Sequence, residues 1–253
     1  MMTGKVEFID VILEVEGRRF LDGVTWQLSP GQSAVVGGAP GSGKSFFPRL
    51  ILGLPGLQEA DHVRMWGDVL LDGVSLYDMD RDELIEVRRS IGTVMAGGGL
   101  IDNMDVERNI TLPLAYHGGR TLASETAQQL QRVVRMMELN DLLRPGLRPV
   151  ALNREEKMRV AIARALLSNP RILMVDELLT GLDRTTSAAL VDILTGPQEV
   201  GGRLFTSSSL RAFLDRADRF WLLEQGKIID LGDSESVRRH NHPWVQNDLA
   251  TTA

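Results

Sequence analysis

Apolar and polar positions alternate along the start of the chain in the way that is typical of β-strands. The runs at 6–15 and 20–28 show this alternation, and each is followed by a turn that contains glycine. A short, mostly apolar run at 33–36 then leads into a cluster of glycines. That arrangement is typical of a buried strand that feeds a loop.

Further along the chain, segments with helical spacing of apolar residues alternate with short apolar runs. We expect helices at 44–54, 80–89, 123–139, 155–167 and 186–194. The middle of the chain, from about 105 to 147, is expected to be helical overall. We expect strands at 67–73, 91–95, 172–175, 203–206 and 220–224. This order of strands and helices predicts an α/β fold. The polar tail from 234 onward is expected to be mobile.

Composition narrows the class of protein. The chain has 253 residues, of which 43% are hydrophobic and 25% charged, so it can bury a core and is not a disordered chain. It has no cysteine, which excludes disulfides and thiolate zinc sites. The formal net charge of −6 argues against nucleic acid as a partner. Because no stretch approaches the roughly 20 apolar residues that span a bilayer, and the start lacks a secretory signal, we expect a cytoplasmic protein.

The glycine cluster matches the phosphate-loop pattern G-x-x-x-x-G-K-[ST] at every position. Glycines let backbone N–H groups point at phosphate oxygens, and the start of the following helix adds positive potential. A glycine turn with a chance lysine is the alternative, but a strand precedes the motif and a helix follows it. Lys44 would bridge the β- and γ-phosphates of ATP, and the Ser45 hydroxyl would ligate Mg²⁺. The expected ATP-binding residues are Gly38, Pro40, Gly41, Ser42, Gly43, Lys44 and Ser45.

Two acids follow the apolar run at 172–175. A buried strand that ends in an acid is where a Mg²⁺ ligand of a nucleotide site is expected, and Asp176 has this position. Glu177 could polarise an attacking water and is the candidate catalytic residue. Solvated acids at an ordinary strand end are the alternative, which the nearby phosphate loop makes the weaker interpretation.

With these motifs and the segments between them, the chain resembles the ATP-binding subunits of ABC transporters over residues 5–232. The segments that carry the resemblance include 67–73, 88–95, 159–166 and 176–183, with Leu178 in place of the usual proline. The resemblance implies a P-loop (RecA-like) core with an antiparallel β subdomain at 1–95 and 157–232. It also implies an inserted helical subdomain at 96–156, followed by a tail at 233–253. In such proteins two copies sandwich ATP head to tail and drive a membrane permease.

Four features depart from the family's pattern. Ala96 stands where the family has glutamine, and Ser208 aligns with its switch histidine. The family's adenine-stacking aromatic should lie near Leu13 or Val15, and neither of these side chains can stack well. The signature Leu-Ser-Gly-Gly-Gln reads Leu152-Asn153-Arg154-Glu155-Glu156.

The altered signature predicts a helix cap in place of an anion site. Asn153 and Glu156 have the spacing of a capping box, so the helix's own carboxylates would occupy the anion site. A carboxylate about 5 Å from a phosphate charge would repel it by roughly 3 kcal/mol at an effective dielectric of 20, partly offset by Arg154 and Mg²⁺. The alternative is drift at a helix cap without functional effect. We expect ATP·Mg²⁺ binding with slow or absent hydrolysis.

Three functional hypotheses follow. The first is a transporter's ATP-binding subunit on the inner face of the cell membrane, paired with itself or a homologue. The second is a non-catalytic partner of an intact ABC ATPase, and the third is a soluble ABC-type ATPase without a permease. Residues 98–114 resemble the permease-facing stretch of subunits from mammalian-cell-entry type lipid transporters, a pattern that related importers share. This resemblance favours a membrane complex and implies a lipid as the cargo.

Overall fold

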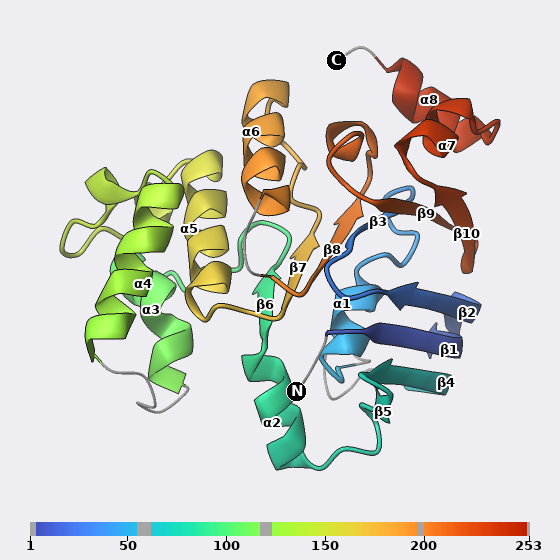
Figure 1. The fold of residues 1–253 in the computed structure, drawn as a ribbon, viewed down its shortest axis with the longest axis horizontal. Helices are drawn as coiled ribbons and strands as arrows, with labels where there is room; N and C mark the ends of the chain where they lie inside the picture. The colour runs from blue at the N-terminus through green and yellow to red at the C-terminus, as the bar shows by residue number, and fades with distance from the viewer. Residues whose placement is uncertain (1–3, 55–61, 117–122, 197–199, 252–253) are drawn as a thin grey trace.

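The computed structural model describes residues 4–54, 62–116, 123–196 and 200–251, which form two β-sheets with helices around them (Figure 1). One sheet has four antiparallel strands in the order β2-β1-β4-β5, and the other has six strands in the order β10-β9-β3-β8-β7-β6. The strands are β1 (Val6–Val15), β2 (Arg18–Leu28), β3 (Ser33–Gly37), β4 (Val63–Leu71), β5 (Val74–Ser75), β6 (Ile91–Val94), β7 (Ile172–Asp176), β8 (Gly202–Ser207), β9 (Arg219–Glu224) and β10 (Lys227–Gly232).

The helices occupy most of the segments predicted for them. They are α1 (Phe46–Ile51), α2 (Arg81–Arg89), α3 (Val106–Tyr116), α4 (Ala123–Met136), α5 (Arg154–Leu167), α6 (Arg184–Thr195), α7 (Ser234–Arg239) and α8 (Pro243–Ala250). Short 3-10 turns lie at Asn140–Leu142, Pro149–Ala151 and Arg211–Phe213. Within the described ranges, no helix is long and apolar enough to cross a membrane. The α/β prediction is confirmed.

The six-stranded sheet brings the predicted site residues together. Its strands β9, β3, β8, β7 and β6 run parallel, and only β10 is antiparallel to its neighbour. The strands β3, β7 and β8 are buried along their whole lengths, as expected for parallel strands covered on both faces. Gly37 of β3 pairs with Ser207 of β8, and Asp176 of β7 pairs with Thr206. The phosphate loop and the acidic strand end therefore both lie at the carboxyl-terminal ends of the parallel strands.

The antiparallel sheet packs on the core through aromatic side chains. The Phe8 ring stacks on Phe47 of α1 at a centroid distance of 4.9 Å and meets Trp26 edge-on at 5.4 Å. Trp26 in turn meets Trp221 of β9 edge-on at 5.7 Å. Such contacts are favourable beyond the apolar area that they bury. This cluster ties β1 and β2 to α1, the helix that follows the phosphate loop.

The carboxyl-terminal segment differs from the prediction of a mobile tail. Residues 234–250 form α7 and α8, which bury Val237 and Val245. Asp233 caps α7, and the His242 side chain accepts from the Trp244 N–H at the start of α8. The expectation is wrong. Each helix buries only a few apolar residues, too few to produce a periodic signal in the sequence. Caps and contacts distant in sequence supply the remaining stability of the two helices. The strand β10 is likewise an addition to the predicted strands.

At the start of α3, Asn109 fixes the preceding loop. Its side chain is 0% exposed and donates to the carbonyls of Ile101, Met104 and Asp105 at 3.0–3.3 Å. It also accepts from the Ile101 N–H at 2.7 Å. One buried amide therefore satisfies several backbone groups of the turn that leads into the helical region.

Replacing this amide should lower the stability of the fold. We expect Asn109→Ala to reduce the free energy of unfolding by about 2–3 kcal/mol, because it leaves buried backbone groups without partners. Urea unfolding followed by circular dichroism measures this, with Asn103→Ala, at an exposed position in the same loop, as the matched control. Equal unfolding midpoints for the two variants would contradict the assignment.

Candidate functional site

The phosphate loop curls as its glycines allow. Gly38 has φ 155°, and a Cβ there would lie 2.5 Å from the Leu223 carbonyl oxygen, so no side chain fits. Gly43 has φ 104°, a backbone region that residues with a Cβ rarely adopt. Ser45 is the N-cap of α1, and the helix begins at Phe46, later than the predicted start at 44. The loop thus stays open up to Ser45, and the first N–H groups of α1, those of Phe46 and Phe47, donate back to the Gly43 and Lys44 carbonyls at 3.0 Å.

Lys44 is the most enclosed charged group of the loop. Its side chain is 3% exposed, and the ammonium donates to the Gly38 and Ala39 carbonyls at 2.7 and 2.9 Å. It also pairs with Glu177 Oε1 at 3.0 Å. Three oxygens therefore surround the buried charge, as burial requires. A phosphate oxygen could take the place of the Glu177 carboxylate.

The two predicted Mg²⁺ ligands meet. Ser45 Oγ donates to Asp176 Oδ1 at 3.0 Å, and the Thr206 hydroxyl donates to the same oxygen. A hydroxyl and a carboxylate are hard oxygen donors of the type that Mg²⁺ prefers, so the residues present fit the ion. The described residues contain no group of three or more His, Cys, Asp or Glu that could hold a metal by themselves. Water and phosphate oxygens would have to complete the octahedron.

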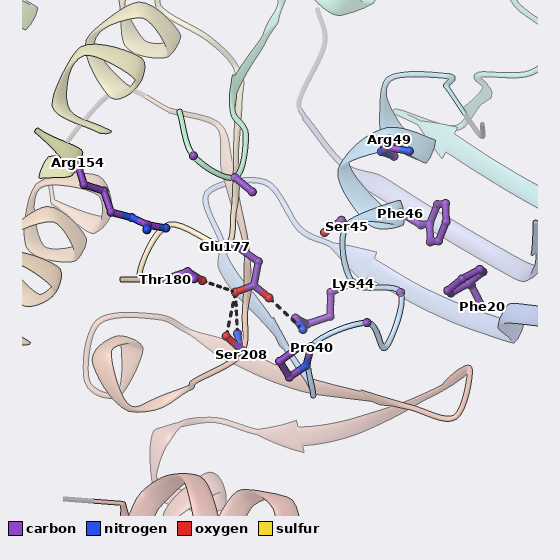
Figure 2. A pocket seen from close by; sticks show the side chains of 14 residues that line it. Phe20, Pro40, Lys44, Ser45, Phe46, Arg49, Arg154, Glu177, Thr180 and Ser208 are labelled. Carbon is purple, nitrogen blue, oxygen red and sulfur yellow. Dashed lines mark hydrogen bonds and ion pairs between the residues drawn. The ribbon is translucent and has the colours of Figure 1, made fainter. Parts of the chain in front are cut away.

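Glu177 is oriented by the segments on both sides of it. Its Oε2 accepts from the Ser208 N–H and hydroxyl at 3.2 and 3.0 Å and from Thr180 Oγ1 at 3.3 Å (Figure 2). Its backbone has φ 49°, in the left-handed region that non-glycine residues seldom occupy. Such conformations concentrate at functional sites. The carboxylate is thereby held between β7, β8 and the phosphate loop.

These residues line one cavity of about 580 Å³, a volume that suits a nucleotide. Five of the predicted binding residues border it: Pro40, Gly41, Gly43, Lys44 and Ser45. Gly38 lies beneath the loop, where its carbonyl binds Lys44. Ser42 does not border this cavity; its hydroxyl is buried, with no hydrogen-bond partner within the described part of the chain. Asp176 reaches the site through Ser45.

The departures from the family's pattern fall at this site. Ala96 and Ser208 both line the cavity, so a bound nucleotide would lie within reach of these two positions. The predicted capping box is confirmed, with Asn153 N–H donating to Glu156 at 2.8 Å and Glu156 N–H to Asn153 at 2.9 Å. Glu155 pairs with Arg159 at 2.8 Å. Both signature carboxylates are therefore engaged within their own helix.

Two aromatic residues of the site were not found by sequence reasoning. Leu13 and Val15, the positions predicted to lie near the base, are buried in the core under the antiparallel sheet and do not line the cavity. Phe20 and Phe46 line the cavity instead, with ring centroids 4.8 Å apart (Figure 2). The Arg18 guanidinium lies 4.6 Å from the Phe20 centroid. Only the fold brings the start of β2 to α1, so the spacing of these residues gave no signal.

The comparisons with known proteins agree with this geometry. The ABC transporter family's sequence pattern matches residues 21–180. The methionine import ATP-binding protein MetN of Clostridium acetobutylicum is 29% identical over 92% of this chain and 70% of that protein. MetN of Haemophilus ducreyi is 32% identical over 88% of this chain and 63% of that protein. The mycobactin import ATP-binding/permease protein IrtB of Mycolicibacterium thermoresistibile is 33% identical over 97% of this chain and 41% of that protein.

A solved dimeric structure of a bacterial ABC transporter cassette matches with a TM-score of 0.75 and 25% identity, over 88% of this chain and 96% of that one. The chain spans about two thirds of the methionine-import relatives and less than half of the mycobactin relative. Because the family's pattern covers more than half of it, the chain belongs to the ABC transporter family, among its ATP-binding subunits.

The Lys44–Glu177 pair predicts how nucleotide affinity responds to the carboxylate. We expect Glu177→Gln to tighten ATP·Mg²⁺ binding by about tenfold, because it removes both the competing partner of Lys44 and a charge that repels the phosphates. Isothermal titration calorimetry measures the change, with Glu235→Gln on exposed α7 as the control. Unchanged or weaker binding would show that the carboxylate does not compete with phosphate.

Proposed function

We propose that this subunit binds ATP·Mg²⁺ in the 580 Å³ cavity and, when isolated, hydrolyses it slowly or not at all. One observation carries the proposal. The buried Lys44 ammonium and the Ser45–Asp176 oxygen pair lie ready for a phosphate and a cation, while Ala96 and Ser208 stand where hydrolysis needs polar or charged groups. The groups that hold a nucleotide remain, and several that would cleave it do not.

The binding step follows from the positions of these side chains. Lys44 would exchange Glu177 for phosphate oxygens, and the α1 N-terminus adds positive potential. Ser45 and Asp176 would hold Mg²⁺, which neutralises phosphate charge when bound. Phe20 and Phe46 offer an aromatic surface to the base. Binding would therefore separate the Glu177 carboxylate from Lys44 and the Ser45 hydroxyl from Asp176.

The weak hydrolysis has identifiable causes. Glu177 is the group that could orient or deprotonate the attacking water. Its neighbour Ser208 donates a hydrogen bond but carries no positive charge near neutral pH. The Ala96 methyl can neither ligate Mg²⁺ nor position water. Developing negative charge on the phosphate thus meets Lys44 but lacks a second cation from these positions.

The proposal includes a membrane permease as partner and a homodimer or heterodimer as the working state, at the inner face of the cell membrane and without nucleic acid. The dimeric state of the related cassette supports the pairing. Arg164 of α5, in the proposed core, donates to the Gly98 and Gly99 carbonyls at 2.8 Å. It fixes the start of the proposed helical subdomain at 96–156, where the permease-like stretch begins. A lipid cargo stays a prediction from the 98–114 resemblance.

The two other functional hypotheses predict different partners and a different dependence of hydrolysis on them. A non-catalytic partner of an intact ABC ATPase would bind ATP equally well and gain hydrolysis only in the heterodimer. A soluble ATPase would function without any permease. Co-purification from membranes with identification of the bound proteins separates the three, because it shows a permease, a second ATPase or neither.

The phosphate loop gives the first prediction of this function. We expect Lys44→Ala to weaken ATP·Mg²⁺ binding by at least about a hundredfold, because it removes the buried cation that faces the phosphates. Calorimetric titration measures it, with Lys227→Ala, an exposed lysine on β10, as the control. Equal affinity of the Lys44→Ala and wild-type chains would contradict the assignment of the loop.

The rate of ATP hydrolysis gives the second prediction of this function. Restoring the missing groups with Ser208→His, Ala96→Gln and a Leu-Ser-Gly-Gly-Gln signature should raise the rate of phosphate release at least about tenfold, since positioned catalytic groups contribute this much or more. The wild-type chain is expected to release phosphate far below about 1 s⁻¹. Wild-type turnover at or above that rate, or no gain in the restored variant that still binds ATP, would sink the explanation.

A further inference from the structure

Phe20 and Phe46 mark the end of the nucleotide cavity where a base would lie. Figure 2 shows both rings on the side of Lys44 away from Glu177. Phe20 lies directly beside the phosphate loop, because a Cβ on Gly43 would be only 3.3 Å from Phe20 Cβ. A nucleotide whose phosphates bind Lys44 would therefore extend its base toward these rings.

The Arg18 guanidinium lies over the Phe20 ring, with its carbon 4.6 Å from the ring centroid. Its Nη2 donates to the Gly41 carbonyl of the phosphate loop at 3.4 Å. In the hairpin of β1 and β2, Arg18 is paired directly opposite Val15, near which the family resemblance places a base-stacking aromatic. Because Val15 is buried in the core and does not line the cavity, Arg18 brings a planar group to this turn in its place.

The Arg18 side chain can leave the Phe20 ring for a ligand at little cost. It is exposed, and no carboxylate of the described residues forms an ion pair with it, whereas the adjacent Arg19 binds Asp22 at 2.9 Å. Its contact with the Gly41 carbonyl is at the long limit of a hydrogen bond. Arg18 also lines a cavity of about 300 Å³ that shares Phe20 and Gly41 with the nucleotide cavity. The guanidinium therefore has room to move onto a bound base.

We propose that Arg18 stacks on the base of the nucleotide that its own chain holds, in place of the aromatic that the family's pattern has near Val15. This inference rests on the proposed function and assigns the base end of the same site. A guanidinium is planar and stacks on aromatic rings through cation–π attraction, which an ammonium on a flexible chain does less well. Stacking favours the larger ring of a purine. ATP should therefore bind more tightly than CTP, and Arg18 should account for part of that difference.

A stacking role depends on the planar shape of the side chain more than on its charge. Arg18→Ala should weaken ATP·Mg²⁺ and ADP·Mg²⁺ binding by an equal factor of about five, and CTP·Mg²⁺ binding by less, because the contact is with the base. Arg18→Tyr should bind ATP·Mg²⁺ within about twofold of wild type, since its ring also stacks, whereas Arg18→Lys should stay close to Arg18→Ala. Arg19→Ala, which removes the adjacent exposed arginine, is the matched control and should bind like wild type. Isothermal titration calorimetry gives these affinities.

A probe without a base separates failure of this inference from failure of the proposed function. Inorganic tripolyphosphate with Mg²⁺ should bind wild-type and Arg18→Ala chains equally, and Lys44→Ala chains much more weakly, since it contacts the phosphate site alone. An Arg18→Ala chain that binds ATP like wild type would overturn the base contact. So would equal losses for ATP and tripolyphosphate, or recovery with lysine but not with tyrosine, because these results would place the arginine on a phosphate. A wild-type chain that binds neither ATP nor tripolyphosphate would instead overturn the proposed function, and the inference with it.

Discussion

One buried positive charge, the ammonium group of Lys44, is the constraint on which the nucleotide site depends. A buried ammonium without partners costs several kcal/mol, so oxygens must surround it in the absence of a ligand. The curled loop supplies two carbonyls, and the end of β7 supplies the Glu177 carboxylate. The loop and the acidic strand end are therefore held together electrostatically, and a phosphate is the natural replacement for the carboxylate. The contact that stabilises the buried Lys44 ammonium therefore opposes nucleotide binding and engages the candidate catalytic group.

The altered positions lie on elements other than the phosphate loop: Ala96 follows β6, Ser208 follows β8, and the signature lies at the start of α5. At the signature, the capping box and the Glu155–Arg159 pair engage both carboxylates within α5, which makes them less available to repel phosphate than a free carboxylate would be. The repulsion of roughly 3 kcal/mol expected from an unpaired carboxylate is an upper bound for this reason. Retained binding groups, a hydroxyl at 208 and a methyl at 96 are the basis of the proposal that this site holds a triphosphate more than it cleaves one.

Sequence reasoning predicted the parts of this site that depend on local signals. The phosphate loop, the acidic strand end and the Asn153–Glu156 capping box are short patterns whose chemistry fixes their geometry. It missed Phe20 and Phe46, which only the packing of β2 against α1 brings together. It also missed the order of α7 and α8, because their stability comes from caps and from contacts such as Leu210 N–H to Asp248, distant in sequence.

The central claim is that the chain holds ATP without consuming it. The most direct measurement incubates the purified chain with ATP and Mg²⁺, removes free nucleotide by rapid gel filtration, and identifies the retained nucleotide by chromatography after increasing times. The account predicts nearly one equivalent of bound nucleotide that is still ATP after many minutes. Bound ADP appearing within seconds, or no retained nucleotide at all, would contradict it.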